Sequence, residues 1–182
     1  VEGRFGAIPF LGHYDVRTTG PTLRGAYELL ISPSQAGNYF FSVFGRDVNP
    51  TPGTYQIVVN TVDRHLSDVT PRSGGNAGSV TLNLSGLGFV EGMQVELRSA
   101  GLLTLTANEV TLASPTSLWA HFDLNGDAPE DYDVVAVWPG GAGETLANAF
   151  TITVGVGPCL EATIEAPSTV RLNRPYVLRL EY

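Results

Sequence analysis

The stretch RSGGNAGSVTLNLSGLGFVEG, residues 72–92, decides the fold because it fits two opposed interpretations. It places glycines on both sides of a short apolar alternation and ends with Gly86, Gly88 and Gly92. A dinucleotide-binding loop needs the spacing G-x-G-x-x-G before a helix whose N-terminus faces the pyrophosphate. Here the third glycine comes one residue late, and the next segment, MQVELRS, alternates like a strand. We therefore predict turns around a β-strand and no nucleotide site.

The same two-residue period recurs along the whole chain, and no window keeps helical spacing for long. Turn signals separate the alternating runs: NPTPG at 49–53, NGDAPED at 125–131 and WPGGAGE at 138–144. Many short strands joined by Gly/Pro turns are typical of all-β sandwiches. Strands are predicted over residues 39–44, 54–62, 80–84, 93–97, 118–122, 132–138 and 150–154, with two more within 162–182.

Breaks in this pattern divide the chain into modules. Residues 63–75 are polar, lose the alternation and contain Pro71, which cannot donate to a central ladder, so we interpret them as a junction. Residues 155–162 form a second junction. The predicted domains are 1–66, 67–156 and 157–182, the last being a linker and the first strands of a further β module.

Composition narrows the classes of partner and chemistry. The net charge of the 182 residues is −8, which disfavours nucleic acid and anionic membranes as partners. All 10 basic residues are arginine, so Schiff-base chemistry and a phosphate-loop lysine are excluded. The single cysteine, Cys159, excludes an internal disulfide and is expected to be inert. No stretch is long and apolar enough for a membrane helix.

A family resemblance begins at Val69-Thr70-Pro71 and continues through Gly74-Gly75, the strand 80–84 and Ser85-Gly86-Leu87-Gly88-Phe89. Together with SLWAHFDL, APEDYDVVAVWPGG and NAFTITV, these residues resemble an IPT/TIG domain over about 67–155. The resemblance implies an immunoglobulin-like sandwich in which Phe89 is a core residue. It also implies that Gly86 and Gly88 occupy positions that exclude a side chain.

The flanking segments resemble other families. Residues 36–43 and 52–59 resemble the closing strands of a bacterial pre-peptidase C-terminal domain, although the family's acidic stretch has no counterpart in residues 1–30. Residues 162–182 resemble the first strands of CARDB-type adhesion modules. The three resemblances together imply an all-β chain of tandem immunoglobulin-like β-sandwiches.

An acidic turn spaces its oxygen-bearing side chains as a calcium loop does, at Asp123, Asn125, Asp127 and Asp131. The position that calcium loops give to glycine is Ala128, and the position of the bidentate glutamate is Val134. A solvated turn between two strands is therefore the better interpretation, and calcium stabilisation remains a hypothesis.

Histidines and tryptophans are the other candidates. His13, His65 and His121 have no mutual spacing that suits zinc, and His121 beside Asp123 lacks a nucleophile motif for a catalytic pair. Trp119, Trp138 and Tyr132 most simply pack in the core or at a junction. An outward Trp119 beside His121 would instead form a sugar-stacking platform or a contact with the next domain.

These observations predict a non-catalytic structural, adhesion-type spacer module of a large secreted or cell-surface bacterial protein. The alternative is a carbohydrate-binding accessory domain of a secreted hydrolase, which requires an exposed aromatic strip. We predict no cofactor and no catalytic, cofactor-binding or metal residue. The expected partners are neighbouring domains of the same chain and a cell-surface protein or glycan, with no nucleic acid and no membrane insertion.

Overall fold

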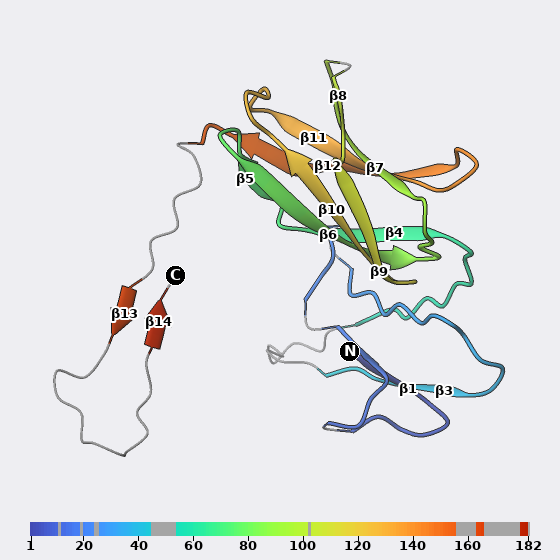
Figure 1. Ribbon diagram of the computed structural model, residues 1–182. Helices are drawn as coiled ribbons and strands as arrows, with labels where there is room; N and C mark the ends of the chain where they lie inside the picture. Colours follow the sequence, from blue (N-terminus) through green and yellow to red (C-terminus); the bar gives the residue numbers. More distant parts are fainter. Residues whose placement is uncertain are drawn as a thin grey trace.

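The computed structural model describes residues 1–10, 12–18, 20–23, 26–44, 54–101 and 103–155, and the backbone of 163–165 and 179–181. Every regular element within these residues is a β-strand (Figure 1). The predicted all-β fold is therefore confirmed. Among the described residues there is no helix with the length and apolarity that crossing a bilayer requires.

The N-terminal part contains a three-stranded antiparallel sheet in the order β2-β1-β3. Its strands are β1 (Glu2–Phe5), β2 (Val16–Arg17) and β3 (Tyr39–Ser42). Side chains of the two outer strands pack against Gly3 in β1. A Cβ on Gly3 would lie 3.0 Å from Val16 Cγ2 and 3.1 Å from Phe41 Cε1.

Residues 65–153 form two sheets packed face to face, as seen in the upper part of Figure 1. The first sheet has the order β4 (His65–Thr70), β6 (Ser79–Leu87), β10 (Ser117–Asp123) and β9 (Glu109–Ser114). The second has the order β5 (Ser73–Gly75), β12 (Gly143–Thr153), β11 (Asp131–Val137), β7 (Gln94–Ser99) and β8 (Thr104–Thr106). A separate two-stranded sheet pairs β13 (Thr163–Glu165) with β14 (Arg179–Glu181).

This strand order is that of an immunoglobulin-like sandwich. The chain crosses between sheets after β4, and β5 then runs parallel to β12 while the remaining neighbours pair antiparallel. A further feature of such sandwiches is a buried tyrosine near the start of the sixth strand that bonds to the backbone just upstream. Tyr132 has this place at the start of β11, and its hydroxyl donates to the Ala128 carbonyl oxygen at 3.2 Å.

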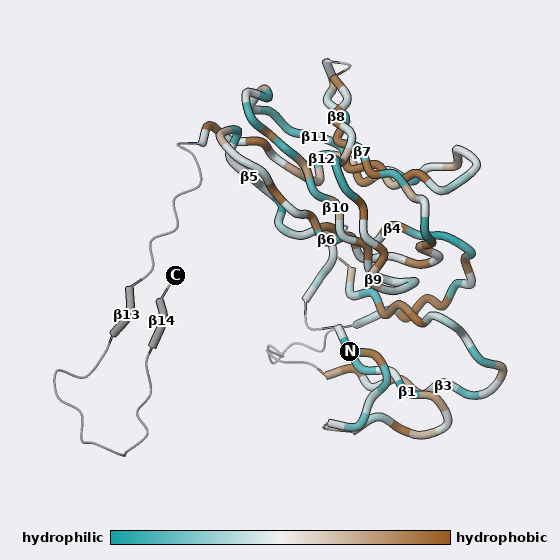
Figure 2. The backbone as a smooth tube through the Cα atoms, viewed as in Figure 1, coloured by the Kyte–Doolittle hydropathy of each residue, from teal (hydrophilic) through white to brown (hydrophobic). Residues whose placement is uncertain are grey.

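The core lies between the two sheets and consists of the inward residue of each alternating pair. In Figure 2 apolar and polar residues alternate along the strands of the sandwich. The largest fully buried side chains are aromatic and come from strands of both sheets. The fully buried members include Tyr132, Phe122, Phe150, Leu66, Leu82, Leu84, Leu97, Leu118, Leu124 and Ile152.

The glycine-rich stretch 72–92 forms turns and strands, as predicted. Its alternating part is β6, and Phe89 is a core residue with 2% of its surface exposed. A Cβ on Gly86 would lie 2.1 Å from the His65 carbonyl oxygen, and Gly88 combines a φ of +70° with an equally close approach to Asp63. These positions exclude a side chain for reasons of backbone packing alone.

The interpretation of residues 63–75 as a junction is wrong, since they provide β4 and β5. A bulge between Leu66 and Asp68 shifts the register against β6, so the buried positions Leu66 and Val69 are three residues apart. A bulge therefore removed the two-residue period from which the strand could have been predicted.

The strand predicted over 54–62 is also absent, because these residues pair with no other segment in the described part of the chain. Its large apolar side chains are exposed, from 50% at Val62 to 74% at Tyr55. Alternation creates an apolar face, but a strand also needs a hydrogen-bonded neighbour. The predicted strands at 39–44, 80–84, 93–97, 118–122, 132–138 and 150–154 are confirmed with shifted ends.

Candidate functional site

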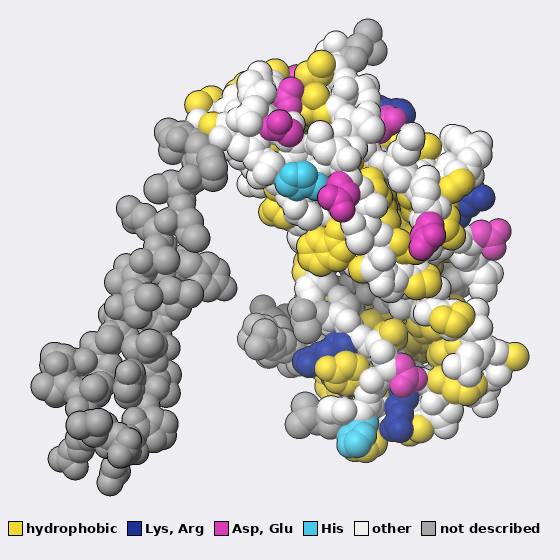
Figure 3. Space-filling model, viewed as in Figure 1, with side chains coloured by type: hydrophobic (Ala, Val, Ile, Leu, Met, Phe, Trp, Pro, Cys, Tyr) yellow, Lys and Arg dark blue, Asp and Glu magenta, His cyan; other side chains and the backbone are white. Residues whose placement is uncertain are grey.

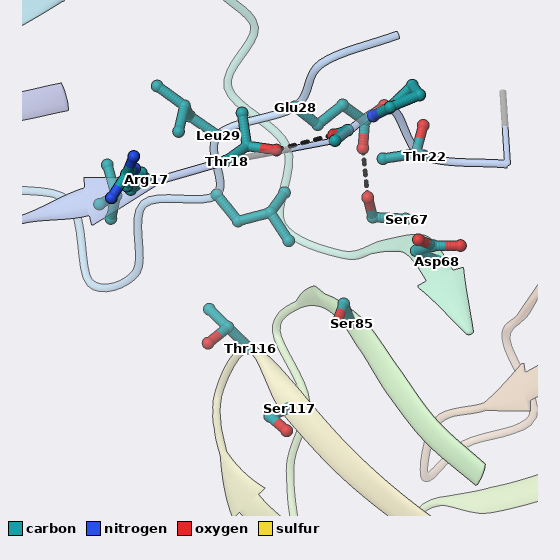
Figure 4. A pocket seen from close by; sticks show the side chains of 14 residues that line it. Arg17, Thr18, Thr22, Glu28, Leu29, Ser67, Asp68, Ser85, Thr116 and Ser117 are labelled. Atoms are coloured by element: carbon teal, nitrogen blue, oxygen red, sulfur yellow. Dashed lines mark hydrogen bonds between the residues drawn. The ribbon is translucent and has the colours of Figure 1, made fainter. Parts of the chain in front are cut away.

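A cleft of about 480 Å³ lies between the N-terminal segment and one end of the sandwich, and we call it the junction cleft (Figure 4). Figure 3 shows the surface hollowed between these two parts. Thr18, Glu28 and Leu29 belong to the N-terminal wall. The opposite wall is the end of the first sheet and includes Ser67, Asp68, Ser85, Thr116 and Ser117.

Glu28 fastens the two walls together. Its carboxylate Oε2 accepts a short hydrogen bond from the hydroxyl of Ser67, which is almost fully buried in β4. The same oxygen lies 3.4 Å from His65 Nε2. Two polar contacts therefore connect one N-terminal carboxylate to the first strand of the sandwich.

His65 lies between two carboxylates from different parts of the molecule. Its Nε2 faces Glu28, and its Nδ1 lies 3.5 Å from Oε2 of Glu144 at the start of β12. Glu144 Oε2 also accepts a 2.7 Å hydrogen bond from the backbone N–H of Leu66. One imidazole therefore lies within ion-pair distance of a carboxylate from the N-terminal segment and a carboxylate from the second sheet.

Trp119 lies on the outer face of the first sheet and is 44% exposed. Its neighbours along β10, Leu118 and Ala120, are fully buried, so the indole points away from the core. In register it stands between Asn83 of β6 and Thr111 of β9. Core packing is thus the wrong role for Trp119 and the right one for Trp138 and Tyr132.

The surface around Trp119 is polar. One step further along β10, His121 Nδ1 lies 3.0 Å from the Thr81 hydroxyl, and its register partner on β9 is Glu109. Figure 3 shows a histidine and an acidic side chain next to an apolar surface over this sheet. The outer face therefore carries one large aromatic ring among hydrogen-bonding groups, which we call the Trp119 face (Thr81, Asn83, Thr111, Trp119 and His121).

The acidic turn does not collect its side chains around one point. Asp131 Oδ1 accepts a 2.6 Å hydrogen bond from the Thr151 hydroxyl, and Asp123 Oδ1 accepts one from the backbone N–H of Asn125 at 3.1 Å. Burial raises the pKa of Asp127, and the nearby Asp123 carboxylate raises it further. In the part of the chain that the structure describes, no three His, Cys, Asp or Glu side chains are grouped to hold a metal ion.

The other candidates are scattered. His13 stacks against Phe10 in the N-terminal segment, with ring centroids 4.4 Å apart. His121 and Asp123 do not form a pair, since the imidazole contacts Thr81 and the carboxylate accepts from the backbone of Asn125. Cys159 and the turn at 49–53 lie outside the described residues.

The carboxylates that hold the junction could not be found from the sequence. Glu28 and Ser67 are 39 residues apart, and Leu66 and Glu144 are 78 apart. No spacing rule connects residues at such separations. The one available signal was the polar run around His65, and such a run is equally typical of a linker.

Comparison of the chain with protein-family models produces no match, and comparison with curated proteins produces none either.

Proposed function

We propose that this chain is a non-catalytic, adhesion-type spacer of a large secreted or cell-surface bacterial protein. In this proposal the sandwich, predicted over residues 67–156 and beginning at His65 in the structure, is an IPT/TIG-type domain that acts together with the module before it. The chain's neighbouring domains are then its principal partners. Extracellular location and bacterial origin follow from the resemblances of its modules to surface and secreted proteins.

The observation that carries the proposal is the fastening at the junction cleft. A spacer transmits a fixed distance only if consecutive modules do not swivel freely. Glu28 reaches from the N-terminal segment to both Ser67 and His65, and His65 also approaches Glu144 of the second sheet. These contacts couple the N-terminal segment to both sheets of the sandwich.

The sandwich also has the local stability that a spacer needs. Its buried core consists of residues between Leu66 and Ile152, and Leu23 of the N-terminal segment packs against it from outside. Gly86 and Gly88 behave as the IPT/TIG resemblance implies, because both lie against backbone atoms. These two close backbone approaches support the IPT/TIG part of the proposal, and they concern packing and not the binding of a ligand.

Small-angle X-ray scattering tests the proposal. Glu28→Ala removes the contacts to Ser67 and His65 and should increase the radius of gyration of the folded chain. Glu91→Ala, which changes an exposed carboxylate elsewhere, is the control and should scatter like the wild type. Unchanged scattering by the Glu28 variant would contradict the fastening by Glu28 on which the proposal rests, and turnover of a peptide or glycoside by the purified chain would contradict a non-catalytic role.

A further inference from the structure

The junction cleft continues onto the Trp119 face along the same two strands. Ser85 of β6 and Ser117 of β10 line the cleft and are directly paired in register. The next outward pair along these strands is Asn83 and Trp119. Side chains on one face of a strand repeat about every 7 Å, so the indole stands one step from the cleft.

The groups along this path suit a ligand rich in hydroxyls. Ser117 Oγ accepts a hydrogen bond from Asn83 Nδ2 at 3.2 Å, which leaves its own O–H to donate to a ligand. Ser85 and Thr116 add two more hydroxyls to the same wall, although that of Thr116 also lies 3.1 Å from Ser114 Oγ; Leu29 lines the N-terminal side of the cleft (Figure 4). A sugar ring presents hydroxyls at its edge and apolar C–H groups on its faces, and the latter stack on an exposed indole.

The charges at the cleft favour an uncharged ligand. The carboxylates of the cleft have partners within the protein: Glu28 is held by Ser67 and His65, and Asp68 lies 3.2 Å from Arg72. The guanidinium of Arg17, also in the lining, lies 3.5 Å from Glu2. With a net charge of −8, the chain repels polyanions.

We infer that the junction cleft and the Trp119 face together bind a neutral polysaccharide chain. One sugar ring enters the cleft between Leu29 and Ser117, and a following ring stacks on Trp119. The volume of about 480 Å³ is within the range of small-ligand pockets. This binding activity goes beyond the spacer function and is independent of it.

Affinity gel electrophoresis and calorimetry with soluble polysaccharides test the inference. The neutral probes are amylose, xylan, mixed-linkage β-glucan and galactomannan, and the charged probes are heparin and polygalacturonate. The wild type should bind at least one neutral probe and neither charged one. Trp119→Ala should weaken that binding about tenfold or more, and Trp119→Phe should weaken it less.

Two further variants test whether the ligand binds in the cleft or to exposed aromatic side chains in general. Ser85→Phe fills the cleft and should also weaken binding, whereas Phe10→Ala removes an exposed aromatic ring of the N-terminal segment and should leave binding unchanged. The inference is overturned if no neutral probe binds, if only the charged probes bind, or if the Trp119 and Ser85 variants bind like the wild type. It is equally overturned if Trp119→Ala leaves polysaccharide binding unchanged and alters only self-association or the unfolding midpoint. Trp119 would then contact protein, in a second copy or in the same chain, and not the ligand. Scattering from the Glu28 variant reports on the spacer function separately.

Discussion

The indole Nε1 of Trp138 donates a 2.7 Å hydrogen bond to the carbonyl oxygen of Gly88. This bond ties the end of β11 to the turn after β6 and thereby links the two sheets at the end of the sandwich nearest the junction cleft. The neighbouring Phe89 ring lies 6.0 Å from that of Trp138, between centroids. One aromatic residue therefore holds the glycine turn in place.

Trp138→Phe keeps an aromatic ring in the core but removes the donor. The Gly88 carbonyl then loses its partner, so the free energy of unfolding should fall by about 1–3 kcal/mol. Urea unfolding followed by far-UV circular dichroism measures the change. Trp119→Phe is the matched control, because its exposed indole makes no such bond, and an equal loss in both variants would contradict this role.

Gly88→Ala should be far more damaging than the same change at another left-handed glycine. Gly126 has a φ of +81°, and a Cβ added there would meet nothing within 4 Å, so Gly126→Ala should cost about 1 kcal/mol. A Cβ on Gly88 would lie 2.2 Å from the Asp63 carbonyl oxygen, and we expect a loss of roughly 3 kcal/mol or more. Equal unfolding midpoints for the two variants would show that backbone conformation alone explains the glycine.

Tyr132→Phe should change how stability depends on pH. Burial raises the pKa of the Tyr132 phenol, with smaller contributions from Glu130 and Asp127. The phenol therefore ionises at a lower pH in the unfolded chain than in the folded protein. The stability that Tyr132 contributes is complete below pH 10 or so, and it is lost as the pH rises through the pKa of the folded state. The variant should lose about 1 kcal/mol at pH 7 with the bond to Ala128, and its stability should fall less between pH 9 and 11. Tyr55→Phe, at an exposed site, should keep the wild-type slope.

Asp127→Asn should stabilise the sandwich at neutral pH. The raised pKa of Asp127 means that folding disfavours its carboxylate, so its contribution is most favourable at low pH and is lost as the pH rises through the folded value. The unfolding midpoint of the variant should exceed that of the wild type at pH 7, and the difference should vanish near pH 3. A difference that grows toward low pH would contradict this environment for Asp127.

Local patterns predicted the sandwich wherever the strand period was uninterrupted. In β6 and β10 the alternation of Leu82 and Leu84, and of Leu118 and Ala120, identified the buried faces correctly. For Trp119 the prediction gave more weight to the general preference of aromatic residues for the core than to this alternation, and core packing was the wrong role.

The parts of the fold and of the cleft that were not predicted depend on pairing between residues far apart in the sequence, which no local pattern specifies. The bulge at Leu66 hid β4, and residues 54–62 have the strand period without a neighbour to pair with. The contacts of Glu28 with Ser67 and His65 follow from how the N-terminal segment packs on the sandwich. Sequence reasoning could therefore predict the all-β fold and most strands of the sandwich, but not the cleft.

The parallel pairing of β5 with β12 has a mechanical consequence. The chain enters the sandwich at His65, beside Gly86, and leaves it at Gly155, beside Asn76 at the other end of β6. These points are separated by the length of β6, which is about 30 Å for nine residues. A force applied between His65 and Gly155 therefore acts parallel to the strands. Many of the backbone hydrogen bonds between strands then resist the force together and do not break one after another.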